Sequence, residues 1–179
     1  MTELQKHDVS ISMAKANIYG VIFALPTAIV QIAGFALVHG VAAFEPQWNI
    51  ALLVIFVAAG ILVHELLHGL SWALFGRKPL TAVKFGFMWK TITPYAHFKE
   101  PLEVNIYRLG IFMPGLVLGI LPYFIAIFTG SGDLFWFSFL HTTAACGDWL
   151  VLWIIRSVKA GSLVEDHPTN AGCYVYESA

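Results

Sequence analysis

The chain alternates between long apolar stretches and short polar connections. Four stretches, at about residues 18–38, 50–75, 106–128 and 134–155, contain almost only apolar side chains. A bilayer core of about 30 Å is crossed by about 20 mostly apolar residues in an α-helix. Each stretch is long enough for one crossing, so the pattern predicts four transmembrane helices.

The connection between the second and third stretches, about residues 80–99, has a different pattern. Its runs 83–89 and 91–98 are rich in β-branched and aromatic residues and carry glycine and proline, which is typical of short strands. We expect a β-hairpin that lies against the membrane or dips into the helix bundle. The predicted fold class is therefore an all-α polytopic membrane protein, a single domain over residues 1–179, with this hairpin-like insertion and a flexible C-terminal tail.

Composition and charge agree with a membrane location. Hydrophobic residues make up 58% of the chain and charged residues 12%, whereas soluble domains contain about 45–50% and about 25%. The 10 Lys and Arg residues all lie in the N-terminal tail, in the region from 77 to 108, or after the fourth stretch, and the loops 39–49 and 129–133 contain none. Because basic residues mark the cytoplasmic side, both termini are expected in the cytoplasm.

We therefore expect an integral protein of a prokaryotic cell membrane, with the lipid bilayer as its surroundings and no cleavable signal peptide. The net charge of −1 gives no electrostatic support to a nucleic-acid partner.

The second apolar stretch carries the motif His64-Glu65-Leu66-Leu67-His68. Histidines four residues apart lie on one face of a helix and can bind one zinc ion together. Glu65, beside the metal, is placed to act as a general base toward water. The alternative is a pair of bundle histidines bonded to backbone carbonyls, with Glu65 in the same network. The cost of a carboxylate in a membrane helix favours the functional interpretation.

A catalytic zinc site has three protein ligands, so a third ligand is needed. Glu65 and Asp148 are the carboxylates within the four stretches. His68 precedes Arg77 by nine residues and Asp148 precedes Arg156 by eight. If both arginines mark the cytoplasmic interface, His68 and Asp148 lie at nearly the same depth, about 12–14 Å in. Asp148 is therefore the predicted third ligand, and the small residues Ala144, Ala145 and Gly147 would let its helix approach the second one closely.

Other candidates are weaker. His141 lies on the same helical face as Asp148 but about 10 Å further toward the outside, so it is either a group beside the site or an ordinary buried histidine. His97 would reach the site only if the hairpin folds inward, and a surface position is the simpler expectation. Glu103, like Glu100, is expected to be an interfacial charge or a helix N-cap. The Gly115–Gly119 spacing indicates close helix packing.

The motif in a membrane helix, the β-rich insertion after it and the later Asp148 resemble the site-2 protease class of intramembrane metalloproteases. The short chain, with His64-Glu65-Leu66-Leu67-His68-Gly69 and Gly147-Asp148, is still more similar to the uncharacterised "putative zincin peptidase" family. The resemblance implies that His64, His68 and Asp148 bind zinc and that Glu65 is catalytic. Site-2 proteases usually carry Asn-Pro-Asp-Gly at the distal aspartate, whereas this chain has Ala145-Cys146-Gly147-Asp148.

The sequence therefore predicts an intramembrane zinc metalloprotease that hydrolyses peptide bonds in or near the membrane. Its substrate would be a membrane protein or a membrane-proximal peptide, held extended against a strand of residues 83–98. The alternative is a non-proteolytic metal-binding membrane protein: a transporter, a sensor or an inactive protease-like partner. A transporter needs a polar path, which the four stretches scarcely offer beyond His141, and an inactive relative would have no reason to keep Glu65.

Overall fold

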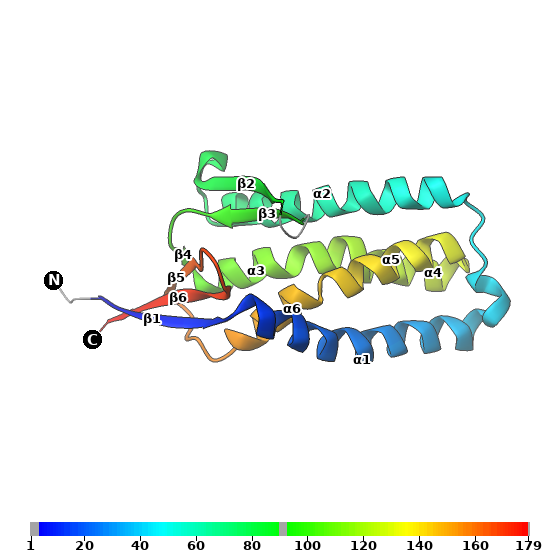
Figure 1. Cartoon of the computed structure of the whole chain (residues 1–179), viewed down its shortest axis with the longest axis horizontal. Helices are drawn as coiled ribbons and strands as arrows, with labels where there is room; N and C mark the ends of the chain where they lie inside the picture. The colour runs from blue at the N-terminus through cyan, green and yellow to red at the C-terminus, as the bar shows by residue number, and fades with distance from the viewer. Residues whose placement is uncertain (1–3, 90–92, 179) are drawn as a thin grey trace.

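The computed structural model describes residues 4–89 and 93–178. Within them, three helical segments are long and apolar enough to cross a membrane: α1 (Met13–His39), α2 (Ile50–Phe75) and the segment Val104–Thr129. The third segment consists of α3 (Val104–Pro114), the π-helical η3 (Gly115–Ile120) and α4 (Leu121–Thr129). These segments run along the long axis of an elongated bundle (Figure 1). They correspond to the first three of the four predicted membrane helices.

The fourth predicted helix is divided into α5 (Gly132–Ala144) and α6 (Cys146–Ile154), with the break at Ala145. At 1.5 Å per residue these helices are about 20 and 14 Å long, so neither alone crosses a bilayer core of about 30 Å. Hydroxyl groups before the break compete for the helix carbonyls, since Thr142 Oγ1 donates to Ser138 O and Thr143 Oγ1 to Phe139 O. Such bonds to the carbonyl four residues earlier bend helices.

Polar side chains cap the N-termini of α2 and α3. Asn49 caps α2 by accepting a hydrogen bond from the Leu52 amide. Glu103 caps α3, because its Oε2 accepts from the amides of Asn105 and Ile106, and this confirms its predicted role as an N-cap. The short 3-10 helices η1 (Val41–Phe44) and η2 (Leu80–Ala82) lie in the connections on either side of α2.

The predicted hairpin is present. Strand β2 (Val83–Met88) pairs antiparallel with β3 (Thr93–Phe98), and the neighbouring positions Thr91 and Ile92, predicted as part of the second strand, lie outside the described residues. The hairpin packs on α2 directly after the motif, where a Cβ at Gly69 would lie only 2.5 Å from Phe85 Cζ. Glycine at this position lets the strand approach the helix, so the hairpin lies against the bundle.

A second sheet corrects the all-α prediction and the flexible C-terminal tail. Strands β1 (Leu4–Ile11), β6 (Ala171–Ser178), β5 (Leu163–Asp166) and β4 (Leu102–Glu103) form an antiparallel sheet in the order β1-β6-β5-β4. Alternate residues of this sheet are buried in the main core cluster with Phe98 and Ile111, namely Val164, Cys173 and Val175. The two ends of the chain therefore fold together, as Figure 1 shows at its left.

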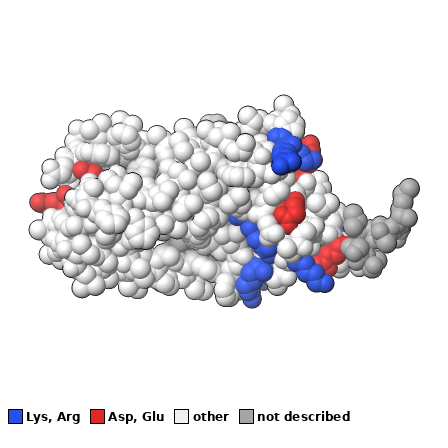
Figure 2. Space-filling view, turned by 180° about the vertical axis from the view of Figure 1, so that it is seen from behind, with Lys and Arg blue, Asp and Glu red and all other residues white. Residues whose placement is uncertain are grey.

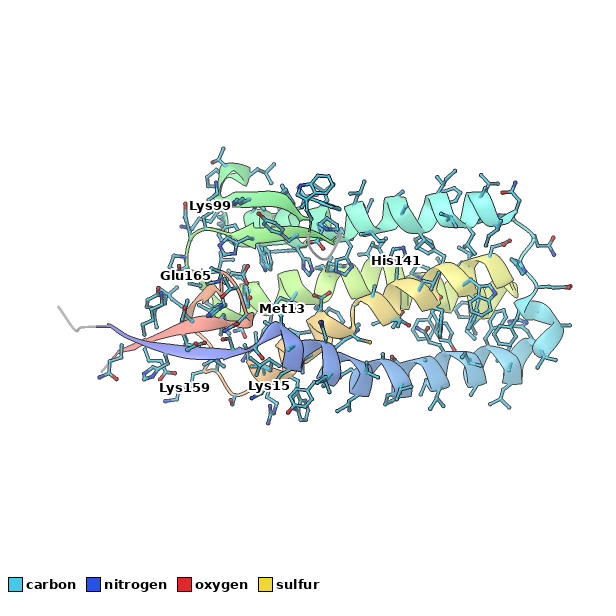
Figure 3. The ribbon with its side chains drawn as sticks, viewed as in Figure 1. Met13, Lys15, Lys99, His141, Lys159 and Glu165 are labelled. Carbon is cyan, nitrogen blue, oxygen red and sulfur yellow. The ribbon has the colours of Figure 1, made fainter. Side chains whose placement is uncertain are left out.

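The basic residues gather at the end of the bundle that carries the termini. In Figure 2, which views the molecule from behind, Lys and Arg lie at this end, and the remaining length of the visible face shows none. Lys15, Lys99 and Lys159 are labelled there in Figure 3. One end is thus basic and the helical body apolar, as the sequence indicates; which side of a membrane the basic end faces stays a prediction.

Candidate metal centre

His64 and His68 of α2 and Asp148 of α6 meet inside the bundle. One ligand atom from each residue can be chosen so that all three lie within 4.8 Å of one another. His64 Nε2 lies 3.0 Å from Asp148 Oδ2, and His68 Nε2 lies 3.5 Å from Asp148 Oδ1. The spacing to Arg77 and Arg156 predicted His68 and Asp148 at the same level, and in the structure the two side chains are direct neighbours. Their role as metal ligands stays a prediction.

The donor set fits zinc. Ligand atoms of a tetrahedral zinc ion, each about 2.0–2.1 Å from the metal, lie about 3.3 Å apart. The two histidine–carboxylate separations, 3.0 and 3.5 Å to one oxygen of Asp148 each, are close to this value, and the three ligand atoms lie within 4.8 Å of one another. Asp148 Oδ2 is buried, and among the described residues it accepts no hydrogen bond of good geometry, although His64 Nε2 lies 3.0 Å away. A buried carboxylate oxygen without a hydrogen bond is costly unless a cation binds it. Two histidines and one carboxylate also leave a fourth position open, as in catalytic zinc sites.

The ring of His68 is oriented by a hydrogen bond at Nδ1, the nitrogen that does not face Asp148. Its Nδ1 lies 2.9 Å from the backbone oxygen of Gly110 on α3. A carbonyl oxygen can only accept, so Nδ1 carries a proton, and in the neutral ring Nε2 then has the lone pair that a metal ligand needs. The ring also stacks on Trp72, with 5.3 Å between ring centroids and 14° between the planes. Sequence reasoning missed Gly110, because a backbone carbonyl has no residue-type signature.

Glu65 points toward the hairpin. Its Oε2 accepts a hydrogen bond of 2.7 Å from the backbone amide of Ala96 on β3. Ala96 stands opposite Phe85 in the β2–β3 ladder, and because its N–H is directed at Glu65, the outer edge of β3 faces the motif. Sequence reasoning placed the hairpin near the site but could not identify the contacting amide.

Neither alternative histidine joins this group. His141 is 2% exposed, and its Nε2 has no hydrogen-bond partner among the described residues; Figure 3 labels it within the helical body. His97 turns away from the cluster and bonds to Asp166 of β5, with 2.9 Å between Nδ1 and Oδ2. His141 is buried against Gly60 of α2, four residues before His64, without joining the cluster, and His97 reaches the second sheet instead of the site.

The prediction that Gly147 beside Asp148 provides a close helix contact needs correction. A Cβ at Gly147 would meet no atom within 4 Å, so this glycine does not provide a helix contact. The close approach to α2 occurs at Gly60, where a Cβ would lie 2.2 Å from His141 Nε2. Gly115 and Gly119 do pack closely, against Trp149 and Thr142, and this confirms the packing predicted from their spacing.

Comparison with known proteins identifies one family. The profile of the family described as "Putative zincin peptidase" matches residues 57–163, which is more than half of the chain. The match contains the motif of α2, the hairpin and α6 with Asp148. The comparisons with curated proteins and with solved structures found no match.

Proposed function

The chain belongs to the family described as "Putative zincin peptidase", which implies a zinc metallopeptidase, and from this premise we propose that it is an intramembrane enzyme. It would hydrolyse peptide bonds in or near the membrane. The observation that carries the proposal is the meeting of His64, His68 and Asp148, with Glu65 beside them, on helices of an apolar bundle. Ionisable side chains inside a membrane bundle cost free energy, and they usually mark a functional site.

In this proposal His64, His68 and Asp148 hold the zinc ion. Zinc at such a site supplies a Lewis acid that polarises the scissile carbonyl and makes water a stronger nucleophile at neutral pH. Glu65 accepts a proton from the attacking water and delivers it to the leaving amine. The Ala96 amide holds Glu65 Oε2, which leaves Oε1 for the water. The Gly110 carbonyl keeps His68 in the tautomer that a ligand requires.

The substrate would be a membrane protein or a membrane-proximal peptide. A helical substrate must unwind first, because its carbonyls are otherwise engaged in helical hydrogen bonds. The outer edge of β3, directed at the motif through the Ala96 amide, offers backbone groups to an extended peptide by β-addition. This mode of action would resemble that of site-2 proteases, with both termini of the chain in the cytoplasm of a prokaryotic cell.

Metal analysis combined with a cleavage assay tests the proposal. The protein is purified in detergent, its zinc content is measured, and it is incubated with single-span membrane peptides and a denatured protein. We expect about one zinc per chain, lost in His64→Ala and kept in Glu65→Gln. Hydrolysis should fall at least about 100-fold in Glu65→Gln, because a positioned general base contributes about 10²–10⁴ in rate.

His141→Ala is the matched control, since it removes a buried histidine outside the cluster and should leave zinc content unchanged. Cleavage by Glu65→Gln at the wild-type rate would contradict the proposed mechanism. Zinc content unaffected by His64→Ala would contradict the proposed ligand set. Zinc binding without hydrolysis of any substrate would favour the non-proteolytic metal-binding alternative.

A further inference from the structure

Asp166, at the end of β5 in the four-stranded sheet, joins two elements that support the metal centre. Its Oδ2 lies 2.9 Å from His97 Nδ1 on β3, and its Oδ1 accepts a 2.8 Å hydrogen bond from the hydroxyl of Tyr107 on α3. The side chain is 19% exposed. Both oxygens are therefore engaged by side chains from different parts of the fold, and Asp166 lies beyond the residues matched by the family profile, which end at 163.

The first connection leads to Glu65. His97 follows Ala96 in β3, and the Ala96 amide donates the 2.7 Å hydrogen bond to Glu65 Oε2. Backbone N–H groups lie in the plane of a hairpin and side chains stand out from it, so the Ala96 amide can contact α2 while the side chain of His97 reaches Asp166. Holding His97 therefore limits the movement of the amide that orients Glu65.

The second connection leads to His68. The ring of Tyr107 stacks on Trp72 with 5.6 Å between centroids and 8° between planes, and Trp72 Nε1 donates to the backbone oxygen of Tyr107 at 3.1 Å. Trp72 also stacks on the ring of His68, so Tyr107, Trp72 and His68 are linked in a chain of ring contacts. Trp72 and Tyr107 are each 3% exposed, so this stack is enclosed and transmits displacement instead of absorbing it.

We propose that Asp166 is a positioning residue that holds β3 and α3 together so that Glu65 and His68 keep their orientation. The inference rests on the proposed function for its catalytic meaning, but the tether is a structural claim that can be tested without any cleavage. The proposal gives the four-stranded sheet that joins the two ends of the chain, here called the terminal sheet, a role in the metal centre. Asp166 itself lies outside the residues that the family profile matches.

The tether depends on charge. The charged groups that face His97 are Asp166 and Glu165 from β5 and Lys84 from β2, its cross-strand partner, while the Tyr107 hydroxyl meets the same carboxylate. The hydrogen bond with Asp166 raises the pKa of His97, against the opposing effect of burial. Because this pKa is raised on folding, the stabilisation is fully present below about pH 6.5. It is lost as the pH rises through the folded value.

Hydrogen exchange of the β3 amides in the full-length protein tests the tether. Asp166→Asn keeps the size of the side chain and removes its charge. A hydrogen bond to a charged partner corresponds to about a tenfold or larger change in an equilibrium, so at pH 6 the segment 93–98 should exchange at least about tenfold faster. The difference from wild type in thermal unfolding should shrink as pH rises. Asp8→Asn is the matched control in the same sheet, because Asp8 of β1 is 54% exposed and accepts a hydrogen bond from Ser10 instead, and it should leave the exchange of β3 unchanged.

The outcomes separate the tether from the proposed function. Unchanged exchange of segment 93–98 in Asp166→Asn overturns the inference, whatever the protein cleaves. Faster exchange with retained zinc and reduced cleavage supports it. If Asp166→Asn exchanges faster but the wild-type protein cleaves no substrate, the tether is supported and the proposed function is contradicted. If Asp166→Asn does not fold, His97→Gln removes only the connection to β3, and the same exchange measurement decides.

Discussion

Gly60 and Gly147 lie in opposite surroundings on the two helices that carry the cluster. A Cβ at Gly60 would lie 2.2 Å from Nε2 of His141, a ring that is 2% exposed and has little room to move. A Cβ at Gly147 would meet nothing within 4 Å. We expect Gly60→Ala to lower the free energy of unfolding by about 1–3 kcal/mol through overpacking. Gly147→Ala should be neutral or stabilising by up to about 1 kcal/mol, because alanine favours helix.

Thermal unfolding of the two variants in detergent checks this contrast, with wild type measured in the same preparation. Equal stability of Gly60→Ala and Gly147→Ala would contradict the packing of His141 against α2. Zinc content should be the same in both variants, since neither residue offers a ligand atom.

At the scale of single residues, the sequence predicted the side chains of the centre but not the backbone groups around them. His64 and His68 share a helical face because of their spacing, and the distances to Arg77 and Arg156 placed Asp148 at their level. The Ala96 amide and the Gly110 carbonyl could not be found in this way, because every residue carries the same backbone groups and only the fold selects which of them meet Glu65 and His68.

Among the elements, the hairpin was predictable and the terminal sheet was not. Residues 83–88 and 93–98 carry a local strand signal and pair with each other, so composition alone indicates them. Strand β1 pairs with β6 across most of the chain, Leu4 opposite Ser178 at one end and Ile11 opposite Ala171 at the other. Pairing over such a separation leaves no local signal, although the alternation of Cys173 and Val175, both buried, with the less buried Tyr174 and Tyr176 is the pattern of a strand with one buried face.

The hairpin also carries a prediction about substrate handling. Ala96→Pro removes the amide that binds Glu65 and the outward donor of β3, while the residues proposed to hold zinc stay untouched on α2 and α6. Since a hydrogen bond to a charged group contributes about 1.5–3 kcal/mol, cleavage should fall roughly 10- to 100-fold with zinc content unchanged. Ala96→Ser keeps the amide and serves as control. Wild-type cleavage by Ala96→Pro would leave the hairpin as a membrane anchor only.

Over the whole molecule, both termini, the four-stranded sheet and the visible Lys and Arg residues share one end of the bundle (Figures 1 and 2). The hairpin that contacts Glu65 follows the end of α2 on this side. The connection between α1 and α2 lies at the opposite end, and its Val41 is 81% exposed. If the basic end faces the cytoplasm, the proposed zinc site is approached from the cytoplasmic half of the membrane.

Cysteine labelling in intact cells tests this orientation. Val41→Cys introduces a thiol at the predicted outer end, and Lys159→Cys introduces one at an exposed position of the basic end. A membrane-impermeant maleimide should label Val41→Cys in intact cells and Lys159→Cys only after permeabilisation. The background should be low, because both natural cysteines are buried and burial raises the pKa of Cys173 to about 12, which leaves little reactive thiolate. Labelling of Lys159→Cys but not of Val41→Cys in intact cells would reverse the orientation, and the proposed site would then open toward the outside.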